Sequence, residues 1–224
     1  MRVILFDIDG TLISTGGAGL AALRLAFAEV FAITEEWEIS LSGRTDRGIA
    51  RELFALHGLE HSNENWESFR DAYLRHLHAE LPRRQGKILA GVAALVHRLS
   101  QEENVALGLL TGNIRKGASA KLEHFRLDHY FQFGGFGDYS EERDDVAREA
   151  WQATQSHFLG RPISGDRVWV IGDTPLDIRC GRYIGAQVAA VATGTFTAKE
   201  LEPFSPDLLL EDLAAPDLLN RLLA

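Results

Sequence analysis

The stretch Val3–Leu12, VILFDIDGTL, decides how the rest of this chain is interpreted. It begins as a continuous apolar run, which is typical of a strand covered on both faces of a parallel sheet. The run ends in two carboxylates, Asp7 and Asp9, followed by Gly10 and Thr11. Residues two apart in a strand project from the same face, so both carboxylates are expected at its carboxyl end. Burying two unpaired carboxylates close together is costly, so a cation or a reaction should accompany them.

Other apolar runs repeat this pattern along the chain. We predict strands at 3–8, 105–110, 130–136, 167–172, 187–193 and 207–210. Helical periodicity separates them at about 90–100, 115–126, 142–157 and 177–184, and the apolar tail is expected to form a last helix. Alternating strands and helices predict an α/β fold with a doubly wound parallel sheet.

One interval breaks this alternation. Between the first strand and about residue 85 the sequence shows no good strand, and helical patterns occupy 19–32, 47–58 and 65–81. The flanking segments, STGGAG and PRRQG, have the composition of hinges. We therefore expect an α/β core formed by residues 1–14 and 86–224, with an inserted all-helical cap domain at 15–85.

Composition narrows the possible functions. The 224 residues are 46% apolar, which is enough for a core domain with a smaller insert. The net charge of −9 argues against sequence-independent binding of nucleic acid, which needs clustered Lys and Arg. No apolar run approaches the roughly 20 residues of a membrane span, and the N-terminus resembles a strand more than a signal peptide. With a single cysteine, Cys180, we expect a cytoplasmic protein that binds neither membranes nor nucleic acid.

A second predicted strand also ends in carboxylates. VWVIGDTPLDI (168–178) places Asp173 after the strand and Asp177 on the opening turn of the next helix. Capping of that helix would explain an Asp there. However, ligands in open parallel sheets bind at the carboxyl edge, and acids from two strands at that edge suit an oxygen-rich Mg²⁺ site.

A third strand ends in LLTGN. The Thr111 hydroxyl and the backbone N–H groups of Gly112 and Asn113 precede a helix that starts near Ile114. Free N–H groups at a helix N-terminus bind anions, so these residues are a candidate phosphate site. An ordinary N-cap is the alternative explanation.

The ordered motifs DIDGTL, LLTGN and GDTPLDI resemble those of the haloacid dehalogenase (HAD) superfamily, in its branch of capped, phosphoglycolate-phosphatase-like enzymes. The resemblance spans nearly the whole chain, and the helical insert lies where that branch carries its cap. It implies a HAD-like Rossmannoid core, a Mg²⁺ cofactor and hydrolysis of a phosphomonoester through an aspartyl-phosphate.

The resemblance also implies residue roles. Asp7 resembles the nucleophile, and Asp9 resembles the general acid and base, whose backbone carbonyl also binds Mg²⁺. Thr111, Gly112 and Asn113 resemble the phosphate-binding second motif. The implied metal-binding residues are Asp7, Asp9, Asp173 and Asp177.

The cation of the third family motif is less regular here. The family usually has a Lys a little after the third strand, but GDYSEERDDVAREA (137–150) contains none. Arg143 occupies the matching place and could bind phosphate, since a guanidinium suits that geometry. The alternatives are that Arg143 is a surface charge, or that Lys116 or Lys121 takes this role.

The segment LSGRTDRGIAREL (41–53) resembles the part of the cap that faces the active site. Arg44, Thr45 and Asp46 are candidates for contacting the substrate, and a solvated turn with Thr45 or Asp46 as N-cap is the alternative. We expect a phosphatase acting on a small phosphorylated metabolite, as a monomer or homodimer. A phosphomutase or a non-catalytic phosphate-binding module are the other possibilities.

Overall fold

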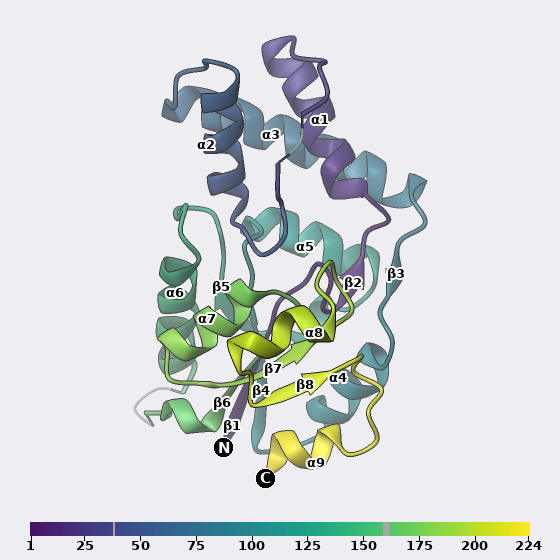
Figure 1. The fold of residues 1–224 in the computed structure, drawn as a ribbon, viewed down its shortest axis with the longest axis vertical. Coiled ribbons are helices and arrows are strands. Elements are labelled where there is room, and N and C mark those ends of the chain that lie inside the picture. Colours follow the sequence, from purple (N-terminus) through teal and green to yellow (C-terminus); the bar gives the residue numbers. More distant parts are fainter. Residues whose placement is uncertain (38, 159–161) are drawn as a thin grey trace.

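A parallel sheet forms the centre of the protein, for which a computed structural model describes residues 1–37, 39–158 and 162–224. Its six strands lie in the order β5-β4-β1-β6-β7-β8 (Figure 1). They are β1 (Arg2–Phe6), β4 (Val105–Leu110), β5 (Phe133–Gly135), β6 (Val168–Gly172), β7 (Gln187–Val191) and β8 (Leu208–Leu210). All neighbouring pairs are parallel, with β1 between β4 and β6. The predicted α/β fold with a doubly wound parallel sheet is therefore confirmed.

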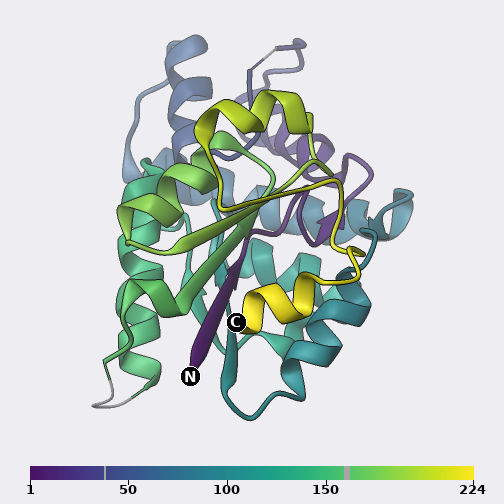
Figure 2. The ribbon, with the colours of Figure 1, turned by 60° about the horizontal axis from the view of Figure 1, so that its bottom comes forward.

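Helices cover both faces of this sheet, as Figure 2 shows. They are α4 (Val92–Ser100), α5 (Arg115–His124), α6 (Arg143–His157), α7 (Pro175–Tyr183), the short α8 (Ala198–Leu201) and α9 (Leu218–Leu223). Side chains of β1 alternate between the two faces. Ile4 and Phe6 pack in the cluster that includes α4, α5 and α9, whereas Val3 and Leu5 pack with α6 and α7. Burial on both faces explains why β1 is apolar without alternation.

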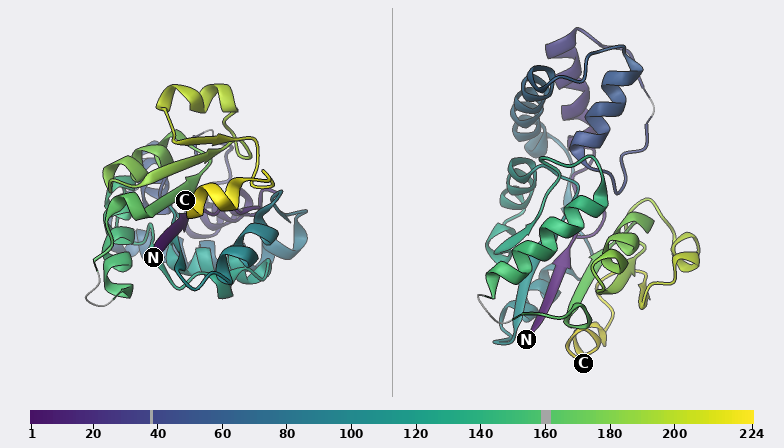
Figure 3. Two further views of the ribbon diagram at one scale, coloured as in Figure 1. Left: turned by 90° about the horizontal axis from the view of Figure 1, so that it is seen from below. Right: turned by 90° about the vertical axis from the view of Figure 1, so that its left-hand side faces the viewer.

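Three helices form the insert between β1 and β4, namely α1 (Ala18–Phe31), α2 (Asp46–Leu56) and α3 (Asn63–Glu80). They lie beyond the carboxyl end of β1, away from both chain termini (Figures 1 and 3). Aromatic rings of Phe27, Phe54 and Phe69 meet in their apolar core. That core also includes Ile114 and Ala120, so the insert is packed against α5.

A two-stranded antiparallel ribbon joins the insert to the rest of the chain. It consists of β2 (Ile13–Ser14) and β3 (Lys87–Ile88). This ribbon was not expected, because two-residue strands carry no detectable periodicity. The domain boundaries at 14 and 86 stay a prediction, and both lie in or next to the ribbon. Among the described residues, no helix combines the length and apolar character needed to cross a bilayer.

Candidate active site

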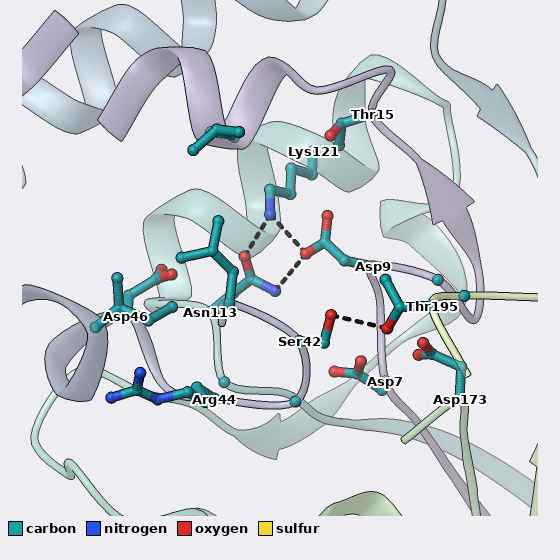
Figure 4. A pocket seen from close by; sticks show the side chains of 18 of the residues that line it. Asp7, Asp9, Thr15, Ser42, Arg44, Asp46, Asn113, Lys121, Asp173 and Thr195 are labelled. Carbon is teal, nitrogen blue, oxygen red and sulfur yellow. Dashed lines mark hydrogen bonds and ion pairs between the residues drawn. The ribbon is translucent and has the colours of Figure 1, made fainter. Parts of the chain in front are cut away.

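A cavity of about 390 Å³ is lined by both the sheet edge and the insert (Figure 4). Lining residues from the α/β part include Asp7, Asp9, Gly112, Asn113, Lys121, Arg143 and Asp173. The insert contributes Leu20, Leu23, Leu41, Arg44, Asp46, Ile49 and Tyr73. The segment expected to face the site therefore does reach it.

Three buried carboxylates meet at one end of the cavity. Asp7 and Asp173 directly follow the neighbouring strands β1 and β6, and Asp177 lies on the first turn of α7. One carboxylate oxygen from each of the three lies within 4.8 Å of the others. The parallel pairing of β1 with β6 thus brings together acids that are more than 160 residues apart in sequence.

These carboxylates carry more negative charge than their surroundings compensate. Burial, followed by repulsion from Asp177, raises the pKa of Asp7 to about 7. The same two causes raise the pKa of Asp173 to about 8. Carboxylate oxygens in a cluster of this kind are the ligands that hard divalent cations prefer, so the donor set fits the expected metal.

Arg143 is the cation that lies within this cluster. It begins α6, is 3% exposed, and its guanidinium donates to the Asp177 carboxylate. Its Nη1 is also 3.9 Å from Oδ1 of Asp7. Burial disfavours the charged guanidinium, but Asp177, Cys180 and Asp7 together outweigh that cost, so the pKa of Arg143 is raised. Arg143 is thus no surface charge, and it lies where the third-motif cation was predicted.

Asp177 is held from two sides. Its Oδ1 accepts from Arg143, and its Oδ2 accepts from the Thr174 hydroxyl at 2.7 Å and the Thr174 N–H at 3.1 Å. Thr174 and Asp177 form a capping box at the start of α7. Capping and membership of the acidic cluster therefore hold together, and Asp177 anchors both Arg143 and the helix.

Asp9 lies apart from this cluster and has a cation of its own. Its Oδ2 accepts from Lys121 Nζ at 2.6 Å and from Asn113 Nδ2 at 2.9 Å (Figure 4). Lys121 also donates to Asn113 Oδ1 at 2.6 Å. Its side chain is 5% exposed, whereas that of Asp9 is 41% exposed.

Sequence reasoning considered Lys121 only as a substitute for the third-motif cation, and missed this pairing with Asp9. The available indication was its position in α5, on the same buried stripe as Ala118 and Leu122. A lysine in an apolar stripe needs a buried partner. The other substitute, Lys116, is exposed.

The second motif forms a compact loop after β4. The Thr111 hydroxyl is buried and accepts from Asn113 Nδ2 at 2.8 Å, and a hydrogen bond with Thr111 is one cause that lowers the pKa of Asp7. Within the described part of the chain, the Gly112 N–H has no acceptor. Gly112 also packs against the insert, since a Cβ there would lie 1.9 Å from the Arg44 carbonyl oxygen.

Two predicted substrate-contacting residues of the insert have partners within the protein, although Arg44 also lines the cavity. The Arg44 guanidinium pairs with Glu52 and donates to the carbonyls of Ser40 and Gly48 at 3.2 Å. Thr45 is fully buried, caps α2 by accepting from the Gly48 N–H, and donates to the Glu141 carbonyl at 2.9 Å. For Thr45 the contacts therefore support the N-cap alternative, because its hydroxyl has both a donor and an acceptor inside the protein.

A loop after β7 also lines the cavity, and this contribution to the site was not predicted. Thr193 donates to the Gly10 carbonyl at 2.6 Å, and Thr195 donates to Ser42 of the insert at 2.9 Å. Gly10 has a φ of +84°, and a Cβ on Gly194 would lie 1.7 Å from Asp173 Oδ2. The close approach of this backbone to Asp173 therefore requires glycine.

Known proteins are similar to this chain over nearly its whole length. The phosphoglycolate phosphatase of Agrobacterium fabrum is 27% identical, over 98% of this chain and 93% of its own length. A putative pyrophosphatase PpaX of Caldanaerobacter subterraneus is 25% identical, over 95% of this chain and 91% of its own. The structure of CbbY from Rhodobacter sphaeroides with bound phosphate superimposes with a TM-score of 0.74 at 19% identity, covering 96% of each chain.

The family model of haloacid dehalogenase-like hydrolases matches residues 4–191. This range includes most of β1, the helical insert, the LLTGN loop and the strand that precedes Asp173. The cluster of Asp7, Asp173 and Asp177 with buried Arg143 lies wholly within it. The chain belongs to the haloacid dehalogenase-like hydrolases.

Proposed function

We propose that the protein is a Mg²⁺-dependent phosphatase that hydrolyses a small phosphomonoester through an aspartyl-phosphate on Asp7. The observation that carries this proposal is the cluster of Asp7, Asp173 and Asp177 with Arg143 at one end of the cavity. We call these four residues the phosphoryl end. Curated relatives named as a phosphoglycolate phosphatase and a pyrophosphatase add support.

At the phosphoryl end, an Asp7 carboxylate oxygen attacks phosphorus in line with the ester oxygen, and the bond to that oxygen breaks. Arg143 and the Gly112 N–H hold the transferring phosphoryl group, whereas the Asn113 N–H donates to the Thr111 hydroxyl at 3.3 Å and Thr111 orients Asp7. A Mg²⁺ bound by Asp7, Asp173 and the Asp9 carbonyl, with Asp177 behind them, would neutralise the charge that otherwise keeps two anions apart.

Four further residues line the cavity around the predicted general acid, and we call them the leaving-group end. They are Asp9, Asn113, Lys121 and Asp46. Asp9 donates a proton to the departing oxygen and then takes one from the water that attacks the aspartyl-phosphate at phosphorus. Its exposed carboxylate can reach both groups. Lys121 and Asn113 fix its orientation through the same oxygen, Oδ2.

The phosphomutase alternative requires a phosphoryl group that is returned to the substrate and protected from water. The non-catalytic alternative requires that the Asp7 carboxylate serve only to bind. Both remain testable, and the intact set of Asp7, Asp9 and Asp173 favours hydrolysis over binding alone.

The test is phosphate release from p-nitrophenyl phosphate and a panel of small phosphomonoesters, with Mg²⁺ or with EDTA. We expect turnover that needs Mg²⁺ and falls at least about 10³-fold in Asp7→Asn. Phosphate transfer to a second substrate in place of release would identify a mutase. Phosphate binding without any turnover would leave the non-catalytic alternative.

A further inference from the structure

The insert lines the cavity with side chains that are mostly apolar. They are Leu20, Leu23, Leu41, Ile49 and Tyr73. Apolar walls hold the carbon skeleton of a ligand, and the few polar groups among them decide which substituents are accepted.

Positive charge is scarce for a second anionic group of a substrate. Arg143 is committed to the phosphoryl end, and the guanidinium of Arg44 is paired with Glu52. Lys121 faces the carboxylate of Asp9 at 2.6 Å. Among the described residues that line the cavity, these three are the cations, and each already has a carboxylate partner.

Asp46 adds a negative charge to this same wall. It is 8% exposed, its N–H donates to the Gly112 carbonyl, and its Oδ2 accepts from the Ile114 N–H, both at 2.8 Å. Within the described residues, the other oxygen, Oδ1, accepts no hydrogen bond. In Figure 4 Asp46 lies on the far side of Asn113 from Asp7 and Asp173.

Asp46 is charged at neutral pH, although burial raises its pKa to about 6. Lys121 and the hydrogen bond from Ile114 counteract burial without cancelling it. The wall therefore presents a carboxylate whose Oδ1 faces the cavity, where it can accept a hydrogen bond from a substrate donor and repels a second anion.

We propose that Asp46 selects phosphomonoesters whose alcohol portion carries a hydrogen-bond donor, a hydroxyl or an ammonium group, and rejects those that carry a second anion. This inference rests on the proposed phosphatase function and narrows its substrate class. It sets the protein apart from its relative named as a phosphoglycolate phosphatase, because phosphoglycolate carries a carboxylate beside the phosphate.

Four two-carbon phosphomonoesters test the proposal, since they differ only in the terminal group. They are 2-hydroxyethyl phosphate, 2-aminoethyl phosphate, ethyl phosphate and phosphoglycolate. We expect the hydroxyl and ammonium esters to have the highest kcat/KM, and phosphoglycolate to fall about 10- to 100-fold below ethyl phosphate. The ratio between the first two shows whether the favoured donor is neutral or cationic.

The variant Asp46→Asn tests whether this residue causes the discrimination against phosphoglycolate. The amide oxygen can still accept from Ile114, but the charge is gone, so phosphoglycolate should approach ethyl phosphate in kcat/KM. Asp138→Asn is the matched control, because Asp138 accepts from the adjacent Arg115 N–H at 2.7 Å but does not line the cavity. We expect the control to keep the wild-type ratio.

Several results would overturn the inference alone. These are a wild-type preference for phosphoglycolate, an equal loss for all four esters in Asp46→Asn, or turnover of p-nitrophenyl phosphate with none of the four. Absence of turnover with every phosphoester, p-nitrophenyl phosphate included, would instead remove the proposed function, and the inference with it.

Discussion

The phosphoryl end and the leaving-group end differ in how far cations of the protein balance their carboxylates. At the phosphoryl end, three carboxylates share one guanidinium, and the pKa values of Asp7 and Asp173 rise to about 7 and 8. At the leaving-group end, Asp9 has a lysine at 2.6 Å and a side chain that is 41% exposed. The first end needs a further cation to balance its carboxylates, whereas Asp9 already has a cationic partner in Lys121.

Removal of Arg143 should change the phosphoryl end and have the largest effect on stability and activity. In Arg143→Ala, buried Asp177 loses its cation, and loss of one partner from a buried pair costs about 3–5 kcal/mol of unfolding free energy. Phosphatase activity should fall about 10²–10³-fold. Denaturant unfolding and phosphate release measure the two effects.

Arg148→Ala is the control for this change. Arg148 lies on the same helix, pairs with Asp145 and has a side chain that is 52% exposed, so little should change. Arg143→Lys should recover stability better than activity, because an ammonium keeps the charge but lacks the planar pair of N–H donors of a guanidinium. Full activity in Arg143→Ala would show that the cation for phosphate lies elsewhere.

The metal-free protein should lose stability as pH rises, because the folded form binds protons on Asp7 and Asp173 more tightly than the unfolded chain does. Their pKa values rise from 3.8 in ordinary surroundings to about 7 and 8. The loss therefore develops between about pH 4 and pH 8. Since each pKa unit corresponds to about 1.4 kcal/mol, the shift of the Asp7 pKa alone corresponds to a loss of a few kcal/mol.

Thermal unfolding in EDTA from pH 5 to pH 8 measures this loss, at about 2–4 °C per kcal/mol for a chain of this size. Mg²⁺ should raise the midpoint most at pH 8, because the carboxylates are most fully ionised there and the ion displaces the fewest protons. Asp7→Asn should flatten the pH dependence. An unchanged slope in that variant would mean that the acidic cluster does not cause it.

The fold and the phosphoryl end were predictable because both depend on local patterns. Apolar runs that end in Asp7, Thr111 and Asp173 mark strand ends, and parallel strands place such ends at one edge. Arg143 was a candidate because the family resemblance implies a cation a little after the third strand. The strand ends themselves need only the order of elements along the chain.

The leaving-group end was predicted less well because it depends on how the insert packs. Arg44 and Thr45 have side chains that suit phosphate, but Arg44 pairs with Glu52 and the Thr45 hydroxyl donates to the Glu141 carbonyl. Lys121 is separated from Asp9 by 112 residues, and the packing of α5 against the sheet brings the two together. Sequence patterns identify residue types, whereas partners across two packed units require coordinates.

Lys121→Met tests the leaving-group end and should lower activity less than loss of Arg143 does. Methionine preserves the shape of the buried stem but leaves Asp9 held by Asn113 alone. If Lys121 orients the general acid, kcat should fall about tenfold for alkyl phosphates, whose leaving oxygen needs a proton. It should fall less for p-nitrophenyl phosphate, because p-nitrophenolate leaves without one.

Lys116→Met is the matched control on the exposed side of the same helix, and should leave both substrates unaffected. An equal loss for alkyl and aryl phosphates in Lys121→Met would assign Lys121 to folding or phosphate binding. The dependence on the leaving group is therefore the decisive measurement.

The smallest expected effect concerns Thr45, which borders Asp46 at the leaving-group end. Its hydroxyl caps α2 and bonds to Glu141, so Thr45→Val should lower the unfolding free energy by about 1 kcal/mol. KM should stay within about twofold of wild type, since a fully buried hydroxyl has no exposed surface to offer a substrate. Thr45→Ser keeps the hydroxyl and should retain most of the stability. A rise in KM in Thr45→Val that Thr45→Ser reverses, without loss of stability, would restore Thr45 as a substrate-binding residue and extend the leaving-group end beyond Asp46.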